Sequence, residues 1–110
     1  MTPDLSPSLA AAAVGTADTA AFLIARPRLF RERPGRAAGS AAALLAWVTV
    51  GTRAAFAESR GDAWTRGLCA ALLASNVAVL AVHLRHGIAG PRVYVGTVAA
   101  AVALAGTFRP

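Results

Sequence analysis

Asp18 lies near the middle of the first apolar stretch of this sequence, and Asn76 lies near the middle of the third. An acid near the middle of a membrane-spanning helix costs ~2.5–3.5 kcal/mol on insertion scales and usually faces the protein interior or a water-filled cavity. Asp18 could therefore carry a proton or a cation. Alternatively, its segment lies shallow in the headgroup region, or the carboxyl group is neutral and only hydrogen-bonded. Because Asn76 is the only amide side chain and falls at a similar depth, we predict a hydrogen bond between the two.

His83 and His86 are three residues apart, which places them on one face of a helix. Neutral imidazole is a common ligand of metals and haem. The pair lacks the third and fourth ligands that zinc needs, and the sequence has no other histidine for a second haem bond. We therefore expect no metal and no cofactor. The two histidines are then ordinary polar residues of the membrane interface, beside Arg85. A haem- or metal-bearing anchor subunit remains an alternative.

The segment 26–36 has the highest charge density in the sequence. It contains two prolines and five arginines, which are Arg26, Arg28, Arg31, Arg33 and Arg36. Such a cluster between two apolar stretches is typical of a cytoplasmic loop under the positive-inside rule. The same arginines could bind anionic lipid headgroups, which attract juxtamembrane arginines by ~1 kcal/mol each. Leu29 and Phe30 interrupt the charges and could enter the membrane interface, which favours binding of the arginines to lipid headgroups.

The composition favours a membrane protein. Hydrophobic residues make up 56% of the 110 residues, above the ~45–50% of ordinary soluble domains. The alternative is an alanine-rich soluble bundle, because alanine raises this fraction while contributing little to insertion. All eleven basic residues are arginine, and the net charge is +6. This charge would suggest nucleic acid in a soluble protein, but loop topology explains it, so we expect no nucleic-acid partner. Cys69 stands alone and can form no intrachain disulfide.

The apolar stretches predict an all-α integral membrane bundle of four short transmembrane helices in a single domain. The second stretch is the strongest, and the first is the weakest, because it is only about 17 residues long and contains Thr16, Asp18 and Thr19. Three spans would remain if the first did not insert. Met1 to Ser8 has no basic residue, so we do not expect a cleavable signal peptide. The predicted spans are 9–25, 37–57, 67–84 and 93–108.

The distribution of arginines predicts the orientation. One set of loops carries Arg26, Arg28, Arg31, Arg33, Arg36, Arg85 and Arg92, and the other carries Arg53, Arg60, Arg66 and Arg109. Seven against four places the first set in the cytoplasm. We therefore expect a multi-pass protein of the cell membrane with both termini outside, whose partners are the lipid bilayer and either another membrane protein or further copies of itself.

Small residues recur four apart in every apolar stretch, which lets helices approach closely in lipid. The runs are Ala11, Gly15, Thr19; Gly39, Ala43, Trp47; Ala70, Ala74, Ala78; and Gly96, Ala100, Leu104. Alanine is so abundant that chance also explains such spacings. The aromatic residues Trp47, Trp64 and Tyr94 are expected to pack between helices or to anchor them at the interface.

No motif indicates a reaction, so we do not expect an enzyme. The sequence favours a non-catalytic structural or accessory subunit of a membrane assembly. Two alternatives stay open. One is a proton- or cation-coupled small transporter that acts as an oligomer through Asp18, and the other is the anchor subunit that uses His83 or His86.

Overall fold

The computed structural model describes residues 6–56, 59, 61–88 and 90–108 of the chain. Over these residues the prediction of an all-α protein is confirmed, because the regular structure is helical and contains no strand. Four helices are long, and one short helix lies between the first two. They are α1 (Pro7–Ala25), α2 (Leu29–Glu32), α3 (Pro34–Ala54), α5 (Ala63–Arg85) and α6 (Pro91–Gly106).

Local signals in the sequence explain where the helices begin. Pro7, Pro34 and Pro91 each stand at the first turn of a helix, where the missing N–H of proline costs nothing. The Ser6 hydroxyl caps α1 by accepting a hydrogen bond from the Leu9 amide, at 3.2 Å. Asp62 caps α5 by accepting a hydrogen bond from the Trp64 amide, at 3.1 Å. All four long helices therefore begin before the predicted spans do, and α3 begins inside the expected basic loop.

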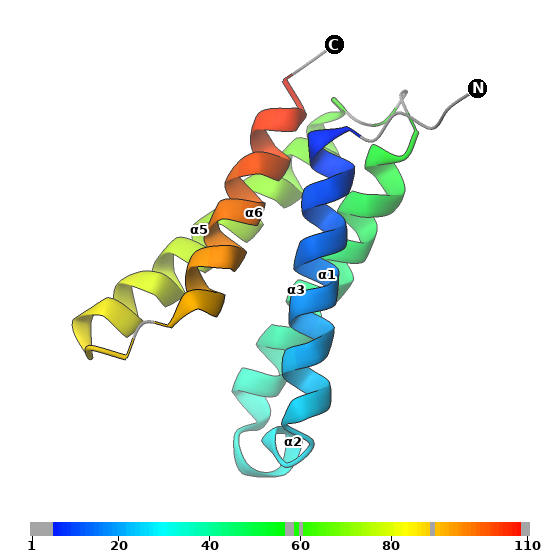
Figure 1. The fold of residues 1–110 in the computed structure, drawn as a ribbon. Helices are drawn as coiled ribbons and strands as arrows, with labels where there is room; N and C mark the ends of the chain where they lie inside the picture. The colour runs from blue at the N-terminus through cyan, green and yellow to red at the C-terminus, as the bar shows by residue number, and fades with distance from the viewer. Residues whose placement is uncertain (1–5, 57–58, 60, 89, 109–110) are drawn as a thin grey trace.

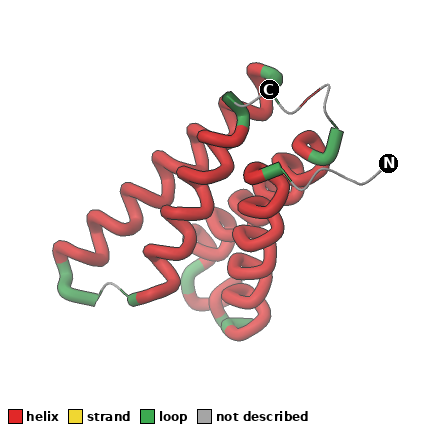
Figure 2. The backbone as a smooth tube through the Cα atoms, turned by 45° about the horizontal axis from the view of Figure 1, so that its top comes forward, coloured by secondary structure: helices red, strands yellow, loops and turns green. Residues whose placement is uncertain are grey.

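The four long helices form two antiparallel hairpins, α1 with α3 and α5 with α6 (Figures 1 and 2). Helix α1 contacts both α3 and α6, and α6 contacts both α1 and α5. Figure 1 shows both chain termini at one end, which we call the terminus end. Helix α2 and the turn between α5 and α6 lie at the other end, which we call the loop end. Towards the loop end α5 diverges from α3.

Small side chains fill the space between the helices. The buried core consists of Ala11, Ala12, Trp47, Val50, Cys69, Leu72, Ala99, Ala100 and Ala103. Gly15 faces the Trp47 ring and Gly106 faces the Ser8 side chain, at approaches too close for any added side chain. The small-residue runs on α1 and α6 therefore lie in helix contacts. The run of Ala70, Ala74 and Ala78 is exposed, and Gly39 faces open space, so spacing alone does not tell which face packs.

Large apolar side chains lie on the outside of the molecule. Among the described residues, α1 and α5 are long and apolar enough to cross a membrane, and α6 is apolar but shorter. Helix α1, which corresponds to the weakest predicted stretch, is thus one of these two candidate spans. Helix α3, which corresponds to the stretch expected to be the strongest, is not a candidate span. The physical reason is that glycine, serine, threonine and two arginines dilute the apolar residues of α3, and alanine adds little hydropathy.

Candidate functional site

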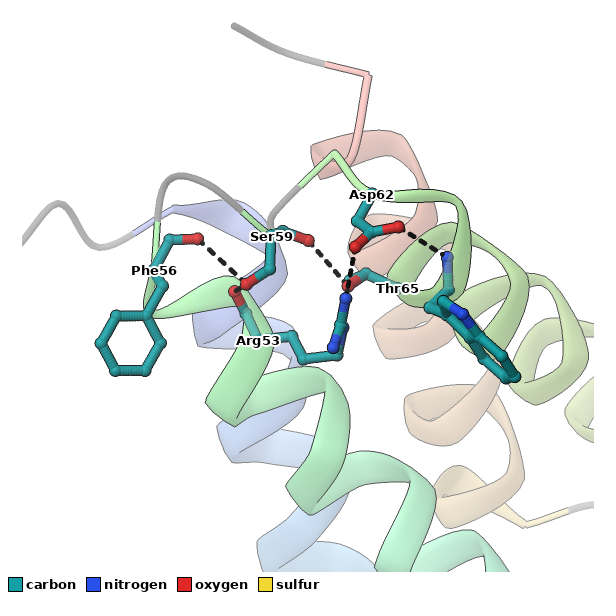
Figure 3. A network of polar contacts seen from close by, with 6 residues as sticks. Arg53, Phe56, Ser59, Asp62 and Thr65 are labelled. Carbon is teal, nitrogen blue, oxygen red and sulfur yellow. Dashed lines mark hydrogen bonds and ion pairs between the residues drawn. The ribbon is translucent and has the colours of Figure 1, made fainter.

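A polar network joins α3 to α5 at the terminus end (Figure 3). The Arg53 guanidinium donates from Nε to the Thr65 hydroxyl at 2.8 Å and forms an ion pair with the Asp62 carboxylate. The Ser59 hydroxyl donates to the Arg53 backbone carbonyl at 2.6 Å. The backbone carbonyl of Ser59 accepts a hydrogen bond from the Thr65 hydroxyl at 2.8 Å. Asp62 thus caps α5 and binds the last turn of α3 at once. Each group has its partner inside the network, so these contacts indicate a structural function.

Two further contacts close the terminus end. Arg66 donates from Nη2 to the Thr107 carbonyl at 2.9 Å, and its guanidinium carbon lies 4.1 Å from the centre of the Phe108 ring. The buried Ser8 hydroxyl donates to the Ala103 carbonyl at 2.8 Å and so links α1 to α6. These contacts tie the helices together at the terminus end, and among its described residues every buried polar side chain has a hydrogen-bond partner.

The loop end is joined by an ion pair between α1 and α6. Arg92 donates from Nε to the Asp18 carboxylate at 3.3 Å and from Nη2 to the Asp18 carbonyl at 2.9 Å. Both side chains are partly exposed, at 44% for Arg92 and 31% for Asp18. Arg92 stands in the first turn of α6, so the pair attaches the start of this helix to the middle of α1.

Three arginines gather on the Phe22 ring beside this pair. The guanidinium carbons of Arg26, Arg36 and Arg92 lie 4.5, 5.9 and 5.3 Å from the ring centre. These are cation–π distances. The three cations come from the end of α1, the first turn of α3 and the first turn of α6, so one ring brings both basic loops together. We call these four residues the arginine cluster.

The predicted hydrogen bond between Asp18 and Asn76 is wrong. The Asn76 amide donates to the Leu72 carbonyl of its own helix at 2.7 Å, and its oxygen lies over Gly96 of α6. Asp18 has Arg92 as its partner instead. The two residues fall at similar depths along their helices, but α6 lies between α1 and α5 and separates them.

His83 and His86 lie at the end of α5 and take no common partner. The His83 Nδ1 is 2.8 Å from the Val79 carbonyl of the preceding turn, whereas His86 is exposed after the last turn of the helix. Gly87, with φ of 69°, then ends α5 in the left-handed conformation that glycine adopts without strain. Among the described residues, no group of three or more histidine, cysteine or acidic side chains is placed to hold a metal ion.

The structure divides the predicted basic loop into two parts. All five arginines are exposed, but Arg26 and Arg36 contact the Phe22 ring and belong to the arginine cluster, whereas the other three lie around α2. Sequence reasoning missed Phe22 and Arg92 as members of the site. The available signal was an aromatic residue four positions from both Asp18 and Arg26, which places the three on one helix face.

Comparison of the chain with family models, curated proteins and solved structures found no match.

Proposed function

We propose that this chain is a small integral membrane protein whose four long helices all cross the bilayer, and that it serves as a non-catalytic structural or accessory subunit of a membrane assembly. The observation that carries this proposal is the surface of α5. Only 11% of its most apolar stretch is buried, and Val77, Val79 and Val82 are each about half exposed. In water such a surface would cost roughly 25 cal/mol per Å² of apolar area, whereas lipid tails accept it.

The core composition supports the same proposal. Alanine, glycine, serine and threonine make up most of the buried side chains among the described residues, beside Trp47, Val50 and Leu72. Many other valines and leucines face outward, with Leu45 at 70% exposure and Val98 at 60%. This is the arrangement expected where helices associate by close packing and hydrogen bonds instead of hiding apolar surface from water. A soluble bundle would place its largest aliphatic side chains inside.

The orientation follows from the arginines. The loop end contains the basic segment around α2 and the turn before α6, so we place it in the cytoplasm under the positive-inside rule. Both termini would then be outside. Helices α3 and α6 complete the four proposed spans. α3 has 21 residues, and α6 has 16, just below the usual range of ~17–25 residues.

The two other functions draw less support from the contacts. A proton-coupled transporter through Asp18 needs a carboxylate that releases its partner, and Arg92 holds both the carboxylate and the carbonyl of this residue. An anchor subunit through His83 or His86 needs further ligands, and these two are the only histidines in the sequence.

Extraction tests this proposal. The protein should stay in the membrane fraction through an alkaline carbonate wash, and in mild detergent it should migrate in an assembly larger than its own 11.1 kDa chain. It should show no absorption of visible light. Release into the alkaline supernatant would exclude membrane insertion, and a lone monomer in mild detergent would exclude the role of a subunit.

A further inference from the structure

We infer that the arginine cluster of Phe22, Arg26, Arg36 and Arg92 binds the phosphate group of an anionic phospholipid at the cytoplasmic surface. This inference rests on the proposed insertion into the membrane and adds a defined lipid site to it. Because all three guanidinium carbons lie within the ~6 Å cation–π range of one ring, no two of them can be more than about 12 Å apart. Arg26 follows the end of α1, Arg36 stands in the first turn of α3 and Arg92 in that of α6, so an anion held by more than one of these arginines joins helices.

The described residues do not balance the charges of the arginine cluster. Asp18 is the one carboxylate among the described residues that bonds to any of its arginines, and it bonds only to Arg92. The guanidinium groups of Arg26 and Arg36 contact the Phe22 ring and make no hydrogen bond within the described part of the chain. Three cations therefore face one carboxylate, and the N–H donors of two of them are unused.

A phosphate group matches these donors. A guanidinium on an aromatic ring keeps the N–H groups of its rigid fork, and this fork pairs with two phosphate oxygens at once. The Phe22 ring holds the guanidinium groups near each other at little cost in side-chain entropy, so the site is partly organised before the anion binds. Arg36 also stands in the first turn of α3 and Arg92 in that of α6, where helix dipoles favour an anion.

The apolar surface beside the cluster favours a lipid over a free phosphate ion. Val95, Val98 and Val102 follow Arg92 along α6 at spacings of three and four residues, which places them in one stripe. They are 43%, 60% and 40% exposed. The stripe runs from the arginine cluster towards the terminus end. A phospholipid whose phosphate binds the cluster can lay an acyl chain along these valines, whereas an inorganic phosphate ion makes no use of them.

Native mass spectrometry of the full chain in mild detergent tests the inference, with phosphatidylglycerol and phosphatidylcholine of the same acyl chains as the probes. The wild type should prefer phosphatidylglycerol. The double variant Arg26→Gln, Arg36→Gln should lose about tenfold or more of this preference, because each arginine contributes several-fold at an anionic surface. Phe22→Leu keeps every charge and should lose about fivefold, because the cation–π contacts disappear.

The matched control is Arg31→Gln, Arg33→Gln, which removes the same charge from the same loop without touching the Phe22 ring. It should keep the preference within about twofold. An equal loss in both double variants would show diffuse charge attraction and overturn the site. Displacement of the lipid by millimolar inorganic phosphate would overturn the choice of a lipid. If the protein resists alkaline extraction but shows no preference for phosphatidylglycerol, only this inference is overturned. If alkali releases the protein from the membrane, the proposed function is overturned.

Discussion

The indole ring of Trp47 lies directly against Gly15, where α3 crosses α1. A Cβ atom at Gly15 would clash with three atoms of the ring, and the ring itself is buried, with 3% of Trp47 exposed. One turn further along, a Cβ at Gly51 would meet the Ala12 methyl group at an ordinary contact distance of 3.4 Å. The glycine therefore makes room for the largest buried side chain in the core, and this pair sets the distance between the two helices.

Gly15→Ala should destabilise the protein by about 1–3 kcal/mol, the usual cost of overpacking a well-filled core. Gly39→Ala is the matched control, because no atom lies within 4 Å of a Cβ at that position of α3. The control should be neutral or slightly stabilising, since alanine favours a helix more than glycine does. Unfolding in detergent measures both variants, and equal stability of the two would show that Trp47 does not pack on Gly15.

Ser8→Ala should weaken the contact between α1 and α6. It removes the buried hydrogen bond to the Ala103 carbonyl, and intramembrane hydrogen bonds of this kind average ~0.6 kcal/mol with a maximum near ~1.7. Ser75→Ala is the control, because Ser75 is exposed on α5. The same unfolding assay compares the two variants, and a loss at Ser75 as large as that at Ser8 would argue against a specific contact at Ser8.

Asp62 has two functions that two substitutions separate. Asp62→Asn keeps a good helix cap but removes the ion pair with Arg53, and since both side chains are about a third exposed, it should cost less than ~1 kcal/mol. Asp62→Ala removes the cap as well and should cost a further ~1 kcal/mol. Unfolding of the two variants in low and high salt measures the difference. If asparagine and alanine were equally destabilising, the cap would have no energetic importance.

Asp18 and Arg92 should be coupled energetically. In a double-mutant cycle with Asp18→Asn and Arg92→Gln, we expect a coupling of about 0.2–1 kcal/mol, as for other partly exposed ion pairs. A second cycle with Asp18→Asn and Asn76→Ala should give a coupling near zero, because these residues share no contact. Coupling to Asn76 that exceeds coupling to Arg92 would restore the pairing that the sequence suggested.

Residue types could indicate where the helices begin and end. Prolines marked these boundaries but did not show whether a proline belongs to a loop or to the first turn of a helix. The cap at Asp62 is a local signal, because aspartate is a favoured N-cap residue and its side chain acts within one turn. Pro34 was assigned to a loop, although proline is equally suited to the first turn of a helix, and α3 begins there. Composition also misjudged α3, where alanine raises the hydrophobic count more than the hydropathy.

The partner of Asp18 could not be predicted from the sequence. The need for a partner was evident, since an acid in an apolar helix requires one, but the choice depends on which helices are neighbours and in which register. Arg92 was counted as a loop charge because it directly follows Pro91, and its contact with Asp18 arises only when α6 packs antiparallel to α1. The same packing brings Arg92 to Phe22 and completes the arginine cluster.

Labelling of single cysteines in intact cells with a membrane-impermeant reagent tests whether all four long helices span the membrane. In a Cys69→Ala background, cysteines are placed at residues 4, 31, 61, 88 and 109. We predict that residues 4, 61 and 109 are labelled from outside, whereas residues 31 and 88 react only after the cells are opened. Labelling of residue 31 on the same side as residue 4 would remove α1 from the spans. Labelling of residues 31 and 61 on one side would contradict four membrane-spanning helices.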